Sequence, residues 1–144
     1  MTTRVGVLYP GRSAEDYYPL LEALLDRVSF RVQHTDIGED AHRVDALLEM
    51  GSSARLAEGA EALRPHGVGS VVWGCTSGSF VFGWDGARAQ AAAVGDRLGV
   101  PASSTSLAFV AAARALGTTR VAVAATYLGV LDAIFGWLVD TLIT

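Results

Sequence analysis

The sequence lacks several residues on which large classes of proteins depend. It contains no lysine, because all eleven basic residues are arginines. This excludes Schiff-base catalysis by this chain, including a pyridoxal-phosphate lysine, and it excludes a Walker-type phosphate loop. A single cysteine, Cys75, excludes an internal disulfide framework and a four-cysteine zinc site.

Charge and long apolar runs are also scarce. Charged residues make up 18% of the chain, the net charge is −4, and the arginines are scattered without forming a run. A nucleic-acid partner is therefore not expected. The apolar stretches are too short to span a membrane, since Asp132 and Asp140 interrupt the longest, and the N-terminus lacks the apolar core of a signal peptide. We expect a cytoplasmic protein without a membrane partner.

What the sequence does contain is a regular alternation of short β-rich runs and helical patterns. At 144 residues and 51% hydrophobic, the chain is long enough to bury a core. Runs of strand type are followed by segments with apolar residues at helical spacing. The expected strands are 4–9, 30–37, 67–74, 100–104 and 120–125; the expected helices are 13–28, 45–63 (with a weak point at Gly51), 86–98, 106–116 and 127–141.

This alternation predicts an α/β fold with an open parallel sheet and helices on both faces. Strands that are apolar throughout fit that architecture, because helices cover both sides of a parallel sheet. Ligands of such sheets bind beyond the carboxyl ends of the strands. Three loops are expected there: 9–12, 74–79 and 125–127.

A weak internal echo indicates how the chain is divided. The run Arg4–Val7 and the run Arg120–Val123 are similar, and each precedes a turn and a helix. We therefore expect a first lobe over 1–117 and the first strand–helix unit of a second, incomplete lobe over 118–144. The apolar run 134–139 is expected to be buried against the last strand or in a self-association interface, which makes a homo-oligomer the expected assembly.

Cys75 is the strongest candidate for chemistry. It follows a predicted strand and precedes Thr76, Ser77, Gly78 and Ser79, whose hydroxyl and amide groups are suited to hold a carboxylate or an enolate. A helix starting there is expected to lower the pKa of the thiol. The alternative is that Cys75 is a small buried hydrophobic residue, and the polar residues after it favour a functional role.

The spacing around Cys75 argues against several known cysteine and metal sites. A cysteine phosphatase loop needs an arginine where this chain has Val81, and a hydrolase elbow needs a second glycine where it has Ser77. All three histidines precede Cys75, which disfavours the hydrolase order of nucleophile and histidine. Neither His34 nor His42 stands in a metal-ligand spacing, so no metal is expected.

Four segments resemble one protein family. The segment Val71–Ser79, which contains Cys-Thr-Ser-Gly-Ser, resembles the first active-site segment of the aspartate/glutamate racemase superfamily, in the branch of maleate cis–trans isomerase and arylmalonate decarboxylase. The segments 7–11, 100–106 and 120–127 are similar to the first strand and loop, the fourth strand, and the opening of the second lobe of that superfamily.

The resemblance implies cofactor-independent chemistry on a small carboxylic or dicarboxylic acid. It makes Cys75 the thiolate nucleophile or base, and Thr76, Ser77 and Tyr127 the donors to the carboxylate and the oxyanion. Pro10 and Gly11 would shape the wall of the pocket.

Besides an isomerase or racemase, three functions stay open. Superfamily members have a second catalytic cysteine in a second lobe, whereas the decarboxylases lack the first-lobe cysteine. The first of these three functions is a decarboxylase, and Cys75 favours an isomerase or racemase over it. The second is a carboxylate-binding remnant without activity, and the third is a flavodoxin-like domain that binds a phosphate cofactor.

Overall fold

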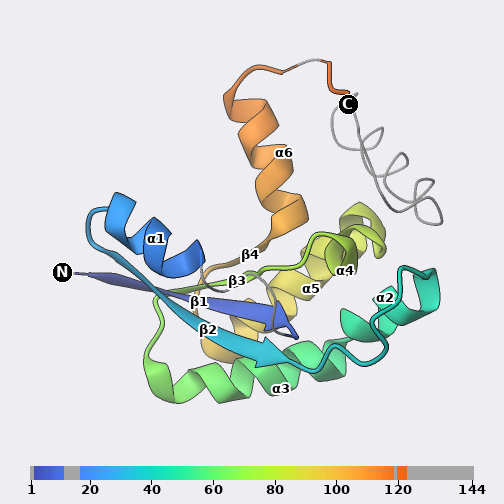
Figure 1. The fold of residues 1–144 in the computed structure, drawn as a ribbon, viewed down its shortest axis with the longest axis horizontal. Helices are drawn as coiled ribbons and strands as arrows, with labels where there is room; N and C mark the ends of the chain where they lie inside the picture. Colours follow the sequence, from blue (N-terminus) through green and yellow to red (C-terminus); the bar gives the residue numbers. More distant parts are fainter. Residues whose placement is uncertain (1, 12–16, 119, 123–144) are drawn as a thin grey trace.

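The computed structural model describes residues 2–11, 17–118 and 120–122. Their centre is a four-stranded parallel sheet in the order β2-β1-β3-β4 (Figure 1). The strands are β1 (Thr3–Pro10), β2 (Val28–Thr35), β3 (Ser70–Trp73) and β4 (Ala102–Ser104). The predicted parallel α/β sheet is thereby confirmed, although β3 and β4 are shorter than the apolar runs that predicted them.

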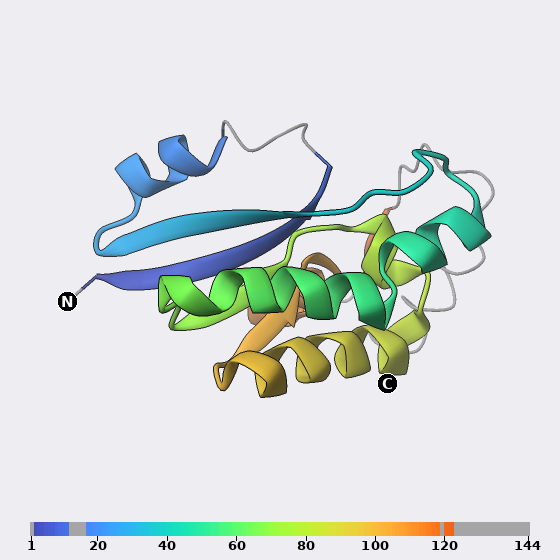
Figure 2. The same cartoon turned by 90° about the horizontal axis from the view of Figure 1, so that it is seen from below.

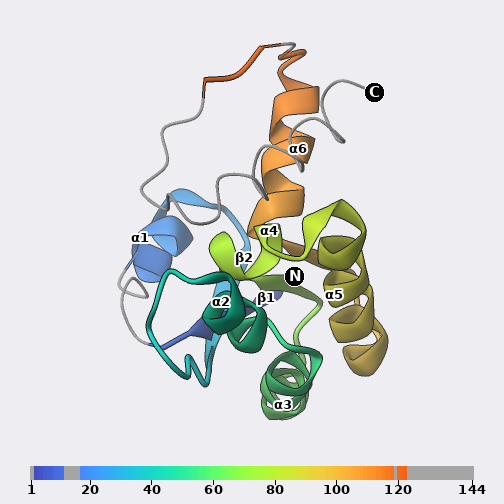
Figure 3. The same ribbon diagram turned by 90° about the vertical axis from the view of Figure 1, so that its right-hand side faces the viewer.

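Helices lie on both faces of the sheet, as predicted. Helices α3 (Ser53–Leu63) and α5 (Gly83–Leu98) run side by side along one face (Figure 2). Helices α1 (Tyr17–Leu24) and α6 (Thr105–Ala115) lie on the other side (Figure 3). The short helices α2 (Val44–Met50), α4 (Ser77–Phe80) and η1 (Arg64–His66) complete the described elements.

The core lies between the sheet and the α3/α5 face. Its fully buried members include Leu8 and Trp73 from the strands and Leu47, Leu56 and Leu63 from the helices. The opposite face is different, because α1 has no buried residue, and its leucines 20, 21 and 24 are exposed, as is Leu25 directly after it. The hydrophobic burial that stabilises this fold is therefore concentrated on one side of the sheet.

Two predicted helices have different limits in the structure. The helix expected over 13–28 ends at Leu24, because Arg27 adopts a left-handed conformation (φ 61°) and Val28 begins β2. The segment expected over 45–63 is divided at Gly51 into α2 and α3, as its weak point indicated. The helical spacing within 45–63 predicts that Leu48 faces the core with Leu47 and Leu56. Leu48 is instead exposed, so its predicted place is wrong.

The last predicted elements fall mostly outside the described residues. Residues 120–122 are described and are not in a strand, so the predicted strand 120–125 does not begin where expected. Residues 123–125 and the predicted helix 127–141 lie outside the described residues, as does the apolar run 134–139. Within the described part of the chain, no helix has the length and apolar character needed to cross a membrane.

Candidate functional site

Adjacent strands bring two of the predicted loops to one edge of the sheet. β1 pairs with β3 in parallel, so both strands end at the same carboxyl edge. β1 ends at Pro10 and is followed by Gly11, and β3 ends at Trp73 and is followed by Gly74 and Cys75. The Gly74 amide donates to the Leu8 carbonyl at 2.8 Å, which extends the strand pairing to the residue before the cysteine.

The Cys75 thiol lies in a tight pocket of backbone and sulfur atoms. Cys75 is 8% exposed, and its Sγ accepts a hydrogen bond from the Gly78 amide at 3.3 Å. The Ser77 Oγ lies 3.8 Å from Sγ, and the thiol donates to the Sδ of Met50 at 3.7 Å. The sulfur therefore faces one backbone donor, one hydroxyl and one thioether.

The protonation state of this thiol differs from the sequence prediction. Burial raises the pKa of Cys75, and hydrogen bonds from the Gly78 amide and from the Ser77 side chain and backbone offset only part of that rise. The expected lowering by a helix N-terminus is therefore wrong as a net effect. The physical reason is that α4 has only four residues, while desolvation penalises a buried thiolate strongly. The resting thiol is protonated at neutral pH.

The polar residues after Cys75 divide into two groups. Ser79 is fully buried, and its hydroxyl donates to the backbone carbonyls of Cys75 at 2.8 Å and Thr76 at 3.0 Å, so it braces the loop from inside. Thr76 is exposed and Ser77 is half-buried, which leaves both near the surface of the carboxyl edge. Thr76 and Ser77 therefore have the position expected of substrate-binding donors, whereas Ser79 has a structural role.

The β1 loop also lies where the sequence predicted. Gly11 adopts a left-handed conformation (φ 66°), which a glycine tolerates without strain. Its amide donates to the Thr35 carbonyl at 3.2 Å, and an added Cβ would lie 3.2 Å from Ile37 Cδ1. Pro10 and Gly11 are half-buried and form a fixed turn at the edge. The remaining predicted donor, Tyr127, lies outside the described residues.

Two features of this edge were missed from the sequence. Ser104 ends β4 and Ser106 lies in the first turn of α6; both are fully buried, and their hydroxyl oxygens are 3.1 Å apart. Their signal was available, because a run of four hydroxyl residues begins at Ser103. Gln90 of α5 donates to the carbonyls of Gly51 at 2.7 Å and Gly78 at 3.0 Å. Its only signal was a polar side chain within an alanine-rich helix.

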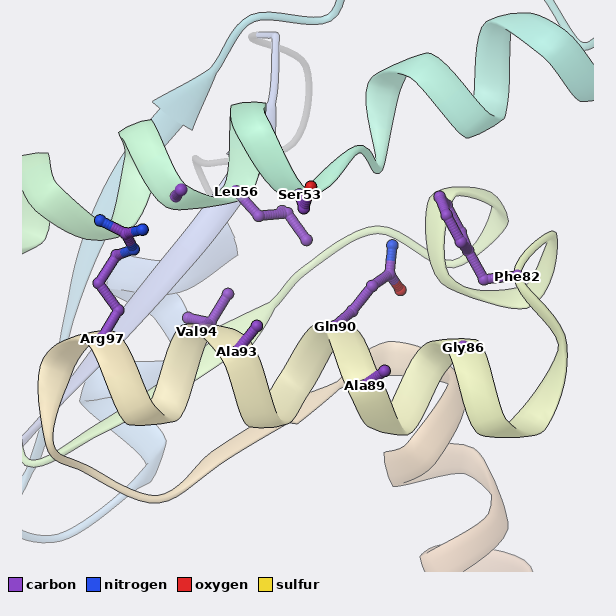
Figure 4. Close-up of a pocket in the computed structure, with 10 residues that line it drawn as sticks. Ser53, Leu56, Phe82, Gly86, Ala89, Gln90, Ala93, Val94 and Arg97 are labelled. Carbon is purple, nitrogen blue, oxygen red and sulfur yellow. The ribbon is translucent and has the colours of Figure 1, made fainter.

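A separate cavity of about 420 Å³ lies between α3 and α5 (Figure 4). Leu56, Phe82 and Val94 give it apolar walls, and Gln90 and Arg97 also line it. None of the residues predicted from the sequence borders this cavity. Among the described residues, no group of three or more histidine, cysteine or acidic side chains is arranged to hold a metal ion.

The arrangement at the carboxyl edge fits proton transfer next to a carboxylate. A protonated thiol donates a proton, and a thiolate accepts one or adds to a double bond. Hydroxyl and amide groups beside the sulfur are the donors that a carboxylate or an enolate requires. The described geometry thus places one thiol beside hydroxyl and amide groups of the kind that could orient an acid.

Comparison with solved structures finds the same architecture in two kinds of enzyme. A liganded glycine-to-cysteine, cysteine-to-serine double mutant of arylmalonate decarboxylase is 26% identical, with a TM-score of 0.79 over 98% of this chain and 59% of that chain. Another arylmalonate decarboxylase structure is 27% identical, with a TM-score of 0.72 over 96% and 60% of the two chains.

The maleate isomerase Iso from Pseudomonas putida S16 shares the fold at 19% identity. Its TM-score is 0.68, and the match covers 81% of this chain and 50% of that chain. A search of curated protein sequences found no match. The chain therefore spans about three fifths of the length of the arylmalonate decarboxylases and half of that of the isomerase.

The family itself is established by sequence. The model of the arylmalonate decarboxylase family matches residues 49–141, which include the Cys75 loop, α5 and α6. The match confirms the resemblance to the decarboxylase and isomerase branch that the motifs indicated. This chain belongs to the arylmalonate decarboxylase family.

Proposed function

We propose that this chain carries the reactive lobe of a cofactor-independent isomerase or racemase that acts on a small carboxylic or dicarboxylic acid. The observation that carries the proposal is the setting of Cys75. Its sulfur lies at the carboxyl edge of the sheet, accepts the Gly78 amide at 3.3 Å, and is followed by Thr76 and Ser77 at the surface. The structural likeness to a maleate isomerase supports the same fold for such an enzyme.

In this proposal, Thr76 and Ser77 bind the substrate carboxylate and stabilise the enediolate that forms next to it. In racemisation, the fraction of Cys75 that has given its proton to water acts as a thiolate and removes the proton beside the carboxylate. Water then delivers a proton to the opposite face of the enediolate. In cis–trans isomerisation, the thiolate adds to the double bond and leaves the neighbouring carbon as an enediolate. Rotation about the new single bond precedes expulsion of the sulfur, which restores the double bond. Pro10 and Gly11 form the pocket wall.

The second candidate is decarboxylation of an arylmalonate, and the family match together with the protonated thiol favours it. Loss of carbon dioxide leaves its bonding electrons on the substrate as an enediolate. The Cys75 thiol then donates its proton to the carbon, and the resulting thiolate recovers a proton from water. Because burial raises the pKa of Cys75, the resting enzyme holds the thiol in the form that this step needs.

Four further parts of the proposal rest on the sequence. Tyr127 is proposed as an additional oxyanion donor, and 118–144 as the beginning of a second lobe. The apolar run 134–139 is proposed to support a homo-oligomer, and the protein is proposed to be cytoplasmic. A sharp monomer in light scattering, with those side chains packed internally, would contradict the oligomer.

The experiment that tests the function is proton NMR in D2O on a panel of acids. Maleate, aspartate, glutamate, a 2-arylpropionate and an arylmalonate are incubated with the protein and with Cys75→Ala. Fumarate formation or deuterium uptake beside the carboxylate supports the isomerase or racemase, and loss of carbon dioxide supports the decarboxylase. Signals that persist in Cys75→Ala contradict the proposed role of Cys75. Silence from folded protein across the panel contradicts the proposed activity and favours a carboxylate-binding remnant.

A further inference from the structure

A buried glutamine connects the helical face of the molecule to the Cys75 loop. Gln90 lies on the inner side of α5 and is 8% exposed. Its Nε2 donates to the Gly51 carbonyl at 2.7 Å and to the Gly78 carbonyl at 3.0 Å. Figure 4 shows its amide nitrogen directed away from α5. One side chain thus joins three parts of the fold that are distant in sequence: α5, the end of α2, and α4.

Both acceptors of this amide belong to segments that contact the sulfur. Gly78 uses its own N–H to donate to Cys75 Sγ at 3.3 Å. Gly51 directly follows Met50, whose Sδ lies 3.7 Å from Cys75 Sγ. Holding the Gly78 carbonyl restrains the backbone that aims its N–H, and holding Gly51 restrains the thioether. Gln90 therefore acts on two sides of the sulfur without touching it.

The close fit of these segments leaves them little freedom. A Cβ added to Gly51 would lie 2.3 Å from the Gly78 carbonyl oxygen and 2.8 Å from Gln90 Nε2. A Cβ added to Gly78 would lie 3.1 Å from Cys75 Sγ. Glycine at both positions permits this approach, and the glutamine amide then fills the space between the two carbonyls.

Packing alone does not explain an amide at this position. Both acceptors are carbonyls, so Nε2 must face them, and this orientation leaves Oε1 buried without a hydrogen-bond partner among the described residues. An unsatisfied buried oxygen destabilises a fold. A leucine or methionine would fill similar space without leaving this oxygen, but it would remove the donor of both carbonyls. What the amide contributes is therefore its hold on the two carbonyls.

We propose that Gln90 is a positioning residue that holds the Gly78 amide and the Met50–Gly51 segment against the Cys75 thiol. Its consequence for turnover rests on the proposed function, whereas its consequence for the thiol does not. A hydrogen bond to a thiolate stabilises the charged form. Without Gln90, the Gly78 N–H is no longer held toward Sγ, and the thiol becomes harder to ionise.

Within the residues that the structure describes, the pKa of Cys75 is shifted by burial and hydrogen bonds rather than by nearby charges. Besides burial, the groups that shift the pKa of Cys75 are the Gly78 amide, the Ser77 hydroxyl and the Ser77 amide. No charged side chain is among them in the described part of the chain. A change in the ionisation of Cys75 on removing Gln90 therefore reports the hydrogen bonds of this loop.

The test uses the chain's single cysteine. The rate of Cys75 alkylation by iodoacetamide is measured against pH for the wild type, Gln90→Leu and Gln33→Leu. Gln33 is a matched control on β2, since its Nε2 also donates to a backbone carbonyl, that of His34 at 3.0 Å. We expect the alkylation midpoint of Gln90→Leu to rise by about one pH unit, which lowers the thiolate fraction about tenfold at neutral pH. The control midpoint stays unchanged.

A second variant keeps the proposal falsifiable if Gln90→Leu fails to fold. Gln90→Asn retains the amide but is one methylene shorter, so it cannot reach both carbonyls, and its midpoint is expected to rise as well. An unchanged midpoint in a folded Gln90 variant overturns the proposal, as does an equal rise in Gln33→Leu. Thermal melting of each variant verifies the fold.

The two proposals fail in different ways. Alkylation needs no substrate, so a raised midpoint in a chain without turnover supports the positioning role and contradicts the proposed function. The converse result is turnover that depends on Cys75 together with an alkylation midpoint that is the same with and without Gln90. That result supports the function and contradicts the positioning role. If both proposals hold, Gln90→Leu lowers kcat about tenfold with little change in KM, because the loss affects the reactive group rather than the carboxylate donors.

Discussion

Two turns at the carboxyl edge of the sheet occupy equivalent places and are built differently. The turn after β4 begins α6, where the Ser104 hydroxyl accepts from the Leu107 amide at 3.4 Å and caps the helix. The turn after β3 begins α4, whose N-cap residue Thr76 makes no side-chain cap. There, the Gly78 amide donates to the Cys75 sulfur.

The difference shows how a polar run can be either structural or functional at the same place in a fold. After β4, the hydroxyls of Ser104 and Ser106 are fully buried and satisfy each other and the helix. After β3, only Ser79 has such an internal role. The Gly78 amide, which a capping side chain could otherwise accept from, donates to the Cys75 sulfur instead. The β3 turn is therefore arranged around the Cys75 sulfur, and the β4 turn around a helix.

The largest expected effect is the loss of turnover when the Cys75 sulfur is removed from the β3 turn. We expect Cys75→Ala to lower turnover on the active substrate by about 10²- to 10⁴-fold, the range typical of a positioned acid or base. Ser104→Ala should retain turnover within a few-fold, because its hydroxyl caps α6. Steady-state kinetics of both variants, with circular dichroism as a control for folding, measures the contrast. Equal losses in the two variants would show that the β4 turn also contributes to the chemistry.

The sequence predicted where the Cys75 turn lies, but it did not predict the contacts that hold this turn. Cys75, Thr76 and Ser77 lie at the carboxyl edge because the strand before them is a local apolar run, which periodicity detects. The protonated state of Cys75 could not be predicted, since it depends on burial by segments distant in sequence, including Met50. Gln90 was missed for the same reason, because both of its acceptors are backbone atoms that only tertiary packing brings together.

The two faces of the sheet show the same limit of local patterns. Leucines at helical spacing predicted α1 and α3 alike, yet Leu56 and Leu63 of α3 are buried and Leu20 and Leu24 of α1 are exposed. Periodicity identifies an apolar stripe on a helix. It does not say what covers that stripe, because the covering groups come from elsewhere in the chain or from another chain.

The next expected effect is a loss of stability when the close packing at the β3 turn is disturbed. Gly51→Ala places a Cβ 2.3 Å from the Gly78 carbonyl oxygen, so α2 or the Cys75 loop must move. We expect a loss of about 1–3 kcal/mol in the free energy of unfolding, as for other overpacked sites. Urea denaturation measures the loss. Gly69→Ala is a suitable control, since its added Cβ meets no atom closer than 3.8 Å. Gly67→Ala is unsuitable because Gly67 has a left-handed φ.

A smaller effect compares two of the buried serines directly, one from each turn. Ser79→Ala removes the hydroxyl donor of the Cys75 carbonyl, whereas the Thr76 carbonyl still accepts from the amides of Ser79 and Phe80. A buried polar group without its partner costs about 1–3 kcal/mol. Ser104→Ala removes one helix cap, which costs about 1 kcal/mol. Denaturant titration of both variants is expected to rank Ser79→Ala as the less stable. The reverse ranking would mean that the β4 turn, rather than the β3 turn, depends more on its internal hydroxyl.

The smallest effect is the dependence of stability on pH that Cys75 itself produces. Burial raises the pKa of the folded thiol above its ordinary value of 9.0, the value expected for the unfolded chain. Below pH 9.0 both states hold the proton, and this contribution to stability is fully present. As the pH rises further, the unfolded chain releases its proton first, so the free energy of unfolding falls until the folded thiol also ionises. One proton limits the slope to about 1.4 kcal/mol per pH unit.

Tyrosines titrate in the same pH range, so the Cys75 contribution is the difference between the wild type and Cys75→Ala. Urea denaturation between pH 7 and 11 should show the wild type losing stability more steeply than the variant. The two curves should differ by a constant amount below pH 9.0 and diverge above it. A wild type that instead gains stability relative to the variant would mean that the donors around the sulfur outweigh its burial. The β3 turn would then hold a thiolate, as a helix N-terminus alone would predict.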